Sequence, residues 1–274
     1  MSSSSISQPT LFIPHGGGPC FFMDWSMGPI DTWHATQRFL ESVAATLPAP
    51  PKALLVISGH WEEAAFTASA APAPQLIFDY YGFPEHTYRL TWPAPGEPKL
   101  AARVAGLLSS AGLPAAISPS RGFDHGVFVP LKVAFPQAQI PVVTLSLARS
   151  PSGELDPALH LAAGRALAPL RDDGVLIVGS GMSFHNLRGY MRPETPERAR
   201  AFDAWLTDAV EAPGPERSAL LADWARAPFA RYAHPREEHL IPLMVAAGAG
   251  GASAGARIFT DEPMGAAISA YRFG

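Results

Sequence analysis

Five histidines in this chain share a setting that suits metal binding. His15 stands between a proline and three glycines in LFIPHGGGP, and His60 follows the apolar run ALLVISG. His125 lies in GFDHGVFVPL, His185 in GSGMSFHNLR and His239 in EEHLIPL. Imidazole is a preferred ligand of zinc, iron, copper and nickel, so three of these side chains together would hold one divalent ion.

These histidines are spread along most of the chain. Their local motifs match neither a helical HExxH zinc site nor a zinc ribbon, so the fold would have to assemble a metal centre from distant segments. A single histidine is more often a hydrogen-bonded structural residue than a ligand. The repeated placement beside glycines and at the ends of apolar runs makes a shared site the better interpretation.

The elements that would position the histidines can be predicted from the pattern of apolar residues. Four apolar runs predict strands buried on both faces, at 10–14, 53–59, 141–148 and 175–181. Their continuous apolar character favours a single α/β domain with a central, mostly parallel sheet and helices on both faces. In such a sheet His15 and His60 project at the carboxyl ends of strands, where open α/β sheets build their sites.

Helical patterns lie between the predicted strands, at 32–47, 97–112, 156–171 and 195–211. In the third, Asp156 is a candidate N-cap and Pro157 fits the first helical position. The late runs 257–262 and AISAYRFG are candidates for edge strands. We expect residues 1–9 to be a disordered polar N-terminus and 10–274 to form the catalytic domain.

The Pro-rich segment 71–98 reads as an ordered loop, because so many aromatic side chains make a poor flexible linker. Five aromatic side chains in or near it are candidates for walling an aromatic substrate, with core packing as the alternative: Trp61, Phe78, Tyr80, Tyr81 and Phe83. Three carboxylates could support metal-bound imidazoles, with surface charge the better interpretation for the two glutamates: Glu62, Glu63 and Asp124.

The remaining histidines and the single cysteine are interpreted mainly as structural residues. His34 and His160 fall in helical patterns, and we expect them to be surface or packing residues. For His234, a position at the start of a helix is a better interpretation than a metal ligand. For His86, in the aromatic loop, contact with a substrate and a structural role are equally good interpretations. Cys20 is interpreted as a small buried apolar residue rather than a catalytic thiol.

The composition of the chain argues against nucleic acids and membranes as binding partners. The chain has 274 residues and a net charge of −4, without a run of basic residues, which argues against a nucleic-acid groove. It lacks a secretory signal pattern and an apolar stretch long enough for a membrane span, so a cytoplasmic protein is expected. One cysteine suits a reducing compartment. The sequence leaves the oligomeric state open, a homo-oligomer included.

Six blocks together resemble one family. They are PHGGGP, SGHWE, GFP…TYRLTWPAPGEP, GFDHGVFVPL, GSGMSFHNLR and EEHLIPL, and they run from about residue 11 to the last predicted strand. The set is similar to the class III extradiol ring-cleavage dioxygenases, specifically the DOPA 4,5-dioxygenase-type branch. This resemblance implies an enzyme that opens the ring of a catechol-type substrate with O2 to give a semialdehyde.

The resemblance also implies roles for the histidines. It places His15, His60 and His239 on the metal, with His185 at the same centre as a further ligand or as the acid/base beside it. It implies that His125 lines the pocket and interacts with substrate or oxygen, and Asp124 is its expected neighbour. The implied cofactor is one divalent ion per chain, Fe(II) for catalysis or Zn(II) as found in relatives.

The wider class uses two histidines and a carboxylate, and here Glu238 stands beside His239. Neighbouring helical positions point about 100° apart, so we favour His239 alone as the ligand.

Two rival functions follow from the same residues. One is a zinc-dependent hydrolase, because three histidines and an open position would also activate water. The other is a non-catalytic metal-binding interaction protein.

Overall fold

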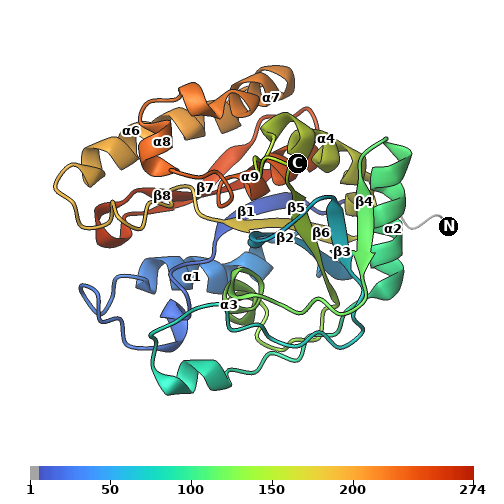
Figure 1. Cartoon of the computed structure of the whole chain (residues 1–274), viewed down its shortest axis with the longest axis horizontal. Coiled ribbons are helices and arrows are strands. Elements are labelled where there is room, and N and C mark those ends of the chain that lie inside the picture. The colour runs from blue at the N-terminus through green and yellow to red at the C-terminus, as the bar shows by residue number, and fades with distance from the viewer. Residues whose placement is uncertain (1–5) are drawn as a thin grey trace.

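This computed structural model describes residues 6–274 of the chain. Its centre is one eight-stranded β-sheet (Figure 1). The strands are β1 Thr10–Pro14, β2 Ala53–Glu63, β3 Phe66–Ser69, β4 Ala115–Ser118, β5 Val142–Ala148, β6 Val175–Gly181, β7 Ala256–Asp261 and β8 Ile268–Phe273. Their order across the sheet is β4–β3–β5–β2–β6–β1–β8–β7.

The four central strands, β5, β2, β6 and β1, run parallel to one another. Every residue of β1, β5 and β6 is buried, which is why these strands appear in the sequence as unbroken apolar runs. β3 and β4 form a parallel pair that runs antiparallel to β5. The mostly parallel sheet predicted from the sequence is therefore confirmed.

The C-terminal strands differ in part from the prediction. β7 is an edge strand as expected, but β8 lies between β7 and β1 and pairs antiparallel with both. The expectation of two edge strands is wrong for β8, because its apolar residues fit an interior position beside β1.

Helices cover both faces of the sheet, as predicted. The helices are α1 His34–Ser42, α2 Pro98–Ser110, α3 His125–Ala134, α4 Pro157–Leu167, α5 Pro169–Asp172, α6 Thr195–Glu211, α7 Gly214–Ala222, α8 Ala230–Ala233 and α9 Ile241–Ala249. Neighbouring residues of β6 show the two faces: the Ser180 hydroxyl donates to the Gly126 carbonyl in α3, whereas Gly179 lies against Pro242 in α9. α3 and α9 accordingly lie on opposite sides of the sheet in Figure 1.

The predicted helices correspond to α1, α2, the pair α4 and α5, and α6. Asp156 caps α4, its carboxylate accepting from the Ala158 N–H at 2.8 Å, with Pro157 at the first position. The apolar pattern predicts neither the short strands β3 and β4 nor the helices α3, α7 and α8. Of these, α3 contains Pro130, a residue that normally signals the end of a helix.

The Pro-rich segment 71–98 is ordered without regular strands or long helices. It contains one short 3-10 helix, Glu85–Arg89. Side-chain hydrogen bonds join parts of the segment to one another and the segment to the rest of the domain. The Tyr80 hydroxyl donates to the Thr87 carbonyl at 2.6 Å, and the Trp92 indole N–H donates to the Phe135 carbonyl at 3.0 Å. The segment is therefore fixed by buried polar contacts of its aromatic residues.

The expected polar N-terminus lies outside the described residues at positions 1–5. Within residues 6–9, Gln8 is buried, and its side-chain amide donates to the Ala49 carbonyl at 2.9 Å. Among the described residues, no helix is both long and apolar enough to cross a membrane.

Close packing of the α9 segment on β6 positions one of the candidate ligands. A Cβ added at Gly179 would overlap the Pro242 carbonyl, and one added at Gly181 would overlap the His239 carbonyl. In addition, the Met182 N–H donates to the His239 carbonyl at 3.0 Å. Glycine on β6 thus lets the chain around His239 lie directly on the sheet.

This packing predicts the effect of one added methyl group. Gly179→Ala should lower the free energy of unfolding by about 1–3 kcal/mol, because the new methyl group meets a backbone carbonyl that cannot rotate away. The matched control is Gly106→Ala in α2, where a Cβ meets nothing within 4 Å. There the free energy of unfolding should rise by about 0.5–1 kcal/mol. Urea denaturation measures both, and equal effects of the two substitutions would contradict this account of the packing.

Candidate metal centre

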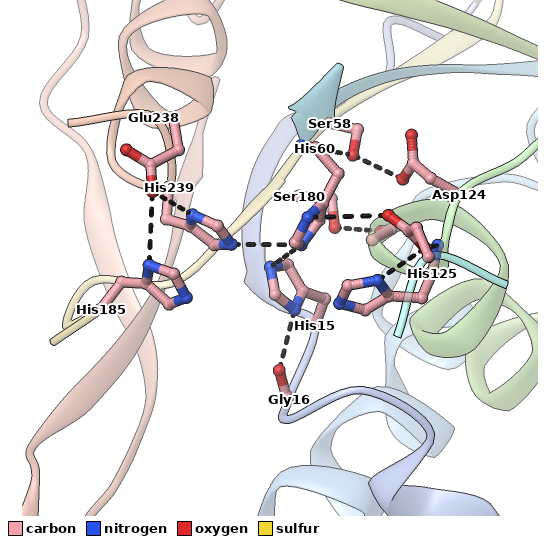
Figure 2. Close-up of polar contacts among 12 residues, drawn as sticks. His15, Gly16, Ser58, His60, Asp124, His125, Ser180, His185, Glu238 and His239 are labelled. Carbon is pink, nitrogen blue, oxygen red and sulfur yellow. Dashed lines mark hydrogen bonds and ion pairs between the residues drawn. The ribbon is translucent and has the colours of Figure 1, made fainter. Parts of the chain in front are cut away.

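Three imidazoles meet at the carboxyl edge of the central strands. His15 follows β1, His60 lies near the end of β2, and His239 stands just before α9. His60 Nε2 lies 3.3 Å from His15 Nε2 and 3.1 Å from His239 Nε2 (Figure 2). The strands β2, β6 and β1 are direct neighbours in the sheet, so two of the three side chains come from strands separated only by β6.

His60 lies within β2 rather than after it. The pairing of β2 with β5 is regular up to Ile57 and resumes, shifted, at Glu62. The irregular stretch between them carries His60. β-bulges commonly lie next to active sites, where they change the direction of a side chain.

Hydrogen bonds define which ring nitrogens carry protons. His15 Nδ1 lies 2.9 Å from the Gly16 carbonyl, and His239 Nδ1 lies 3.0 Å from Glu238 Oε1. Because both partners are acceptors, each Nδ1 must carry the proton, and each Nε2 then presents a lone pair. Both lone pairs point toward His60 Nε2.

Burial keeps these three side chains neutral. Desolvation, followed by the nearby histidines, holds the pKa values of His15 and His239 well below the ordinary value. Burial and then the charge of His125 also lower the pKa of His60. Neutral imidazole is the form that binds metal ions.

The arrangement fits a bound cation. Two inward lone pairs repel, and a proton on His60 Nε2 would satisfy only one of them. With metal–nitrogen bonds of about 2.0–2.1 Å, nitrogens at adjacent tetrahedral or octahedral positions lie roughly 2.9–3.4 Å apart. The observed 3.1 and 3.3 Å fall in this range. His15, His60 and His239 therefore fit one divalent ion, and nitrogen donors of this kind suit both iron and zinc.

Glu238 lies behind His239 rather than beside it on a common ion. Its Oε1 accepts from His239 Nδ1 and is also 3.5 Å from His185 Nδ1. Although burial opposes ionisation, the hydrogen bond and charge of His185, aided by Arg236, lower the pKa of Glu238. An ionised carboxylate in this position fixes the tautomer and orientation of His239.

His185 belongs to the same cluster but not to the three-nitrogen group. Its ring stacks on His239 with centroids 3.4 Å apart and an interplanar angle of 14°. A nitrogen of His185 groups with Glu238 and His239, whereas the compact set of ring nitrogens comes from His15, His60 and His239. His185 also lines the adjoining cavity.

His125 lies on the other side of the three-histidine group. Its ring centroid is 3.9 Å from that of His60 and 5.4 Å from that of His15. Asp79 Oδ1 accepts from both the backbone N–H and Nδ1 of His125, at 2.9 and 2.8 Å. Burial would raise the pKa of Asp79, but the hydrogen bonds and charge of His125 outweigh it and bring the pKa to about 2.

The carboxylate that contacts His125 is not its sequence neighbour. Asp124 precedes His125 directly, but its carboxylate accepts from the Ser58 hydroxyl at 2.7 Å and from Arg121 at 2.9 Å. Among the available carboxylates named from the sequence, Asp124 therefore supports Ser58 and Arg121 instead of an imidazole. Asp79 was missed because it lies 46 residues away in the Pro-rich segment, at no recognisable spacing.

A cavity of about 470 Å³ opens beside the cluster. His15, His60, His125 and His185 all contribute to its lining. Of the aromatic side chains proposed as walls, Tyr80 and Phe83 line it. The other three do not: Trp61 packs under Arg121, Phe78 packs on Phe128, and Tyr81 is 88% exposed.

The glycine run after His15 makes room for this wall. Gly18 has a φ of +56°, in the left-handed region that favours glycine, and a Cβ there would lie 2.9 Å from the Phe83 ring. The three glycines thus let the backbone turn under the aromatic side chains of the cavity.

The other candidates lie outside the centre. His34 is exposed, and His86 is exposed and bonds through Nε2 to the Phe22 carbonyl at 3.0 Å, so neither reaches the cavity. His160 and His234 are buried and bonded to backbone groups within the fold. Cys20 is buried, and burial raises the pKa of its thiol.

The two glutamates named with Asp124 pair with other residues. Glu62 forms an ion pair with Arg236 at 2.5 Å. Glu63 accepts from the Trp61 indole N–H at 2.9 Å. Neither carboxylate accepts from one of the five clustered histidines.

Comparison with known proteins gives a consistent result. Residues 9–274 match the family model described as the catalytic LigB subunit of aromatic ring-opening dioxygenase. The chain is 39% identical to the dioxygenase tasH of Hapsidospora irregularis, over 97% of this chain and 85% of that protein. It is 36% identical to the 4,5-DOPA dioxygenase extradiol of Beta vulgaris, over 100% and 99% of the two chains.

A solved structure is also similar. The crystal structure of an uncharacterized protein from Escherichia coli K12 matches with a TM-score of 0.77 and 28% sequence identity. The match covers 97% of this chain and all of the other. The similarity in fold therefore extends over nearly the whole chain.

The three-histidine group predicts the effect of removing one imidazole. His239→Ala should abolish binding of one Zn(II) or Fe(II) per chain, because two nitrogens remain and Glu238 loses its partner. Equilibrium dialysis with metal analysis measures the stoichiometry. The matched control is His34→Ala at an exposed position of α1, which should bind metal like the unaltered chain. Full occupancy in His239→Ala would contradict the proposed ligand set.

The carboxylate behind His239 should matter less than the ligand itself. Glu238→Gln should weaken metal binding about 10- to 100-fold, the usual loss when a partner of a ligating histidine is removed. Glu262→Gln, which loses only a surface pair with Arg200, serves as the control. The two variants should unfold at similar temperatures without metal, and unchanged affinity in Glu238→Gln would show that this carboxylate does not orient His239.

Proposed function

The chain belongs to the LigB family of catalytic subunits of aromatic ring-opening dioxygenases, and we propose that it opens the ring of a catechol-type substrate with O2 in a metal-dependent reaction. The observation that carries the metal dependence is the set of three Nε2 atoms that lie within 4.8 Å of one another, two of them with outward-facing Nδ1–H groups already bonded. An Fe(II) ion held by His15, His60 and His239 would supply the redox chemistry that O2 requires.

The cavity is well shaped to bring a planar diol to this group. Its volume of about 470 Å³ accommodates a single substituted aromatic ring, and its imidazoles form one end. The aromatic side chains Tyr80 and Phe83 can contact the ring face and exclude water. A ring held here with its two oxygens toward the histidines lies within reach of both acid/base candidates.

His125 has a polarised imidazole that can handle a proton. With Nδ1–H donating to Asp79, Nε2 is the nitrogen left to accept from a substrate hydroxyl or to donate to an oxygen. A carboxylate behind a histidine holds the ring in one tautomer and stabilises its protonated form, as in other catalytic pairs. We assign His125 to orienting substrate or oxygen and Asp79 to positioning His125.

His185 is the second acid/base candidate. Its Nδ1 is directed to Glu238, and its ring is held against His239 by stacking. The reaction needs a base that takes the proton of a catechol hydroxyl and an acid that returns a proton to the departing oxygen, and one imidazole can do both. We assign the acid/base role to His185 beside the metal rather than a fourth place in the ligand set, because its ring nitrogens lie outside the compact group.

The direct test is ring opening by the reconstituted protein. Protein loaded with Fe(II) without oxygen, then mixed with catechols in air-saturated buffer, should consume one O2 per catechol and produce the yellow ring-opened product. Zn(II)-loaded protein serves as the comparison. Hydrolysis of esters or amides by the Zn(II) form, with no O2 uptake by the Fe(II) form, would favour a zinc hydrolase instead. Metal binding without either reaction would favour an interaction protein.

The Asp79 contact predicts a measurable loss of rate. Asp79→Asn should lower kcat for ring opening about 10- to 100-fold, because the amide no longer fixes the His125 ring in one orientation. Metal affinity should change little, since Asp79 is 3.8 Å from His60 Nδ1 and contacts no other member of the ligand set. Asp173→Asn, which loses a surface pair with Arg103, is the matched control. A normal kcat in Asp79→Asn would remove the positioning role.

A further inference from the structure

Apart from its histidines, the cavity has largely apolar walls. Among the residues that the structure describes, those lining it include no lysine, arginine, aspartate or glutamate. Apart from the four histidines and Gly16–Gly18, the lining consists of aromatic side chains, methionines and one leucine: Trp25, Trp33, Tyr80, Phe83, Tyr190, Met27, Met182, Met191, Met264 and Leu187.

Three of the four hydroxyl and indole N–H groups in these walls already have partners within the protein. The Tyr80 hydroxyl donates to Thr87, the Tyr190 hydroxyl lies 3.3 Å from the Phe184 carbonyl, and the Trp25 indole N–H donates to Met27 at 3.1 Å. The Trp33 indole nitrogen has no partner but is enclosed, and a neutral N–H does not balance a carboxylate charge. Hydrogen bonding to a ligand is therefore concentrated at the histidine end.

The mouth of the cavity is apolar as well. Met27, Leu187 and Met191 line it and are 48%, 72% and 64% exposed. Met191 and Met264 both have positive φ angles, of 60° and 53°, and the Met191 N–H donates to the Met264 carbonyl at 3.1 Å. Non-glycine residues in this conformation are rare and cluster at functional sites. Here they hold two thioether side chains in the cavity wall.

No arginine or lysine among the described residues lines the cavity. Arg121 pairs with the buried Asp124 carboxylate at 2.9 Å and lies over the Trp61 ring. Arg188 lies next to Leu187 in sequence but is exposed and does not line the cavity. A carboxylate on a bound catechol would thus lose its water without gaining a charged partner, which is costly in an apolar site.

We propose that the substrate is a catechol whose ring substituent is uncharged and apolar, an alkyl- or arylcatechol rather than a catechol amino acid or catechol carboxylate. This inference rests on the proposed ring-opening function and specifies its substrate class. It separates this chain from relatives whose names specify DOPA, a substrate with both an ammonium and a carboxylate group. The substituent lies along the methionine and aromatic walls while the two hydroxyls face the histidines.

A substrate series tests the proposal with the Fe(II)-loaded full chain. The ratio kcat/KM should rise about two- to fourfold for each methylene from 4-methylcatechol to 4-butylcatechol, the gain expected from burying a CH2 group. DOPA and 3,4-dihydroxyphenylacetate should be at least tenfold poorer than 4-propylcatechol. Equal or better values for the charged substrates would overturn the substrate class while leaving ring opening intact. No ring opening or O2 uptake with any catechol would overturn both proposals.

Binding gives a second readout that does not require turnover. Trp25 and Trp33 line the cavity, so quenching of tryptophan fluorescence in the Zn(II)-loaded protein reports the dissociation constants of the same catechols. These should follow the same order, with 4-propylcatechol at least tenfold tighter than 3,4-dihydroxyphenylacetate. The reverse order would overturn the proposal independently of the kinetics.

One substitution should change the preference. Leu187→Arg places a cation at the mouth and should shift the ratio of kcat/KM for 3,4-dihydroxyphenylacetate over 4-propylcatechol at least tenfold toward the carboxylate. Ile117→Arg, at an equally apolar but distant exposed position on β4, is the matched control and should leave the ratio unchanged. An unchanged ratio in Leu187→Arg would show that the apolar mouth does not set the substrate class.

Discussion

Two buried imidazole lone pairs directed at a third imidazole are the constraint on which the rest of the site depends. A cation among them would relieve their mutual repulsion, and both Nδ1–H groups are bonded on the far side, which holds the lone pairs in this direction. The Gly16 carbonyl does this for His15, and the Glu238 carboxylate does it for His239. The sheet brings the three side chains together, and these outer partners fix the direction of two of them.

The charged side chains of the site contact the imidazoles from outside the cavity. Two ionised carboxylates flank the cluster. Asp79 bonds His125 and lies 3.8 Å from His60 Nδ1, and Glu238 bonds His239 and lies 3.5 Å from His185 Nδ1. Neither carboxylate lines the cavity. Under the proposed function, this arrangement would offer neutral nitrogens to a metal and oriented imidazoles to a substrate, while the remaining walls are apolar. Polar groups at one end and apolar surface at the other would then orient a bound ring.

Much of the fold could be predicted because its central strands are buried on both faces. The runs in β1, β2, β5 and β6 and the caps of α4 depend on local properties of the sequence, so pattern analysis finds them. The short strands β3 and β4 and the Pro130-containing α3 owe their structure to tertiary contacts and were missed. The interior position of β8 is likewise a matter of pairing, which local hydropathy does not encode.

The candidate site divides in the same way. Histidines beside glycines are visible in a sequence, and the resemblance to a family assigns them to one centre. The partners of these histidines are not visible. Asp79 reaches His125 only through the folding of the Pro-rich segment, whereas the adjacent Asp124 turns to Ser58 and Arg121. Proximity in sequence misleads here because side chains of successive residues point in different directions.

The central claim is that one metal ion lies among the Nε2 atoms of His15, His60 and His239. Anomalous diffraction at the absorption edge of iron or zinc, from crystals of the metal-loaded chain, tests it most directly. The account predicts a single peak about 2.0–2.2 Å from each of the three Nε2 atoms. A peak at the His185–Glu238 pair instead, or none among the three nitrogens, would contradict it.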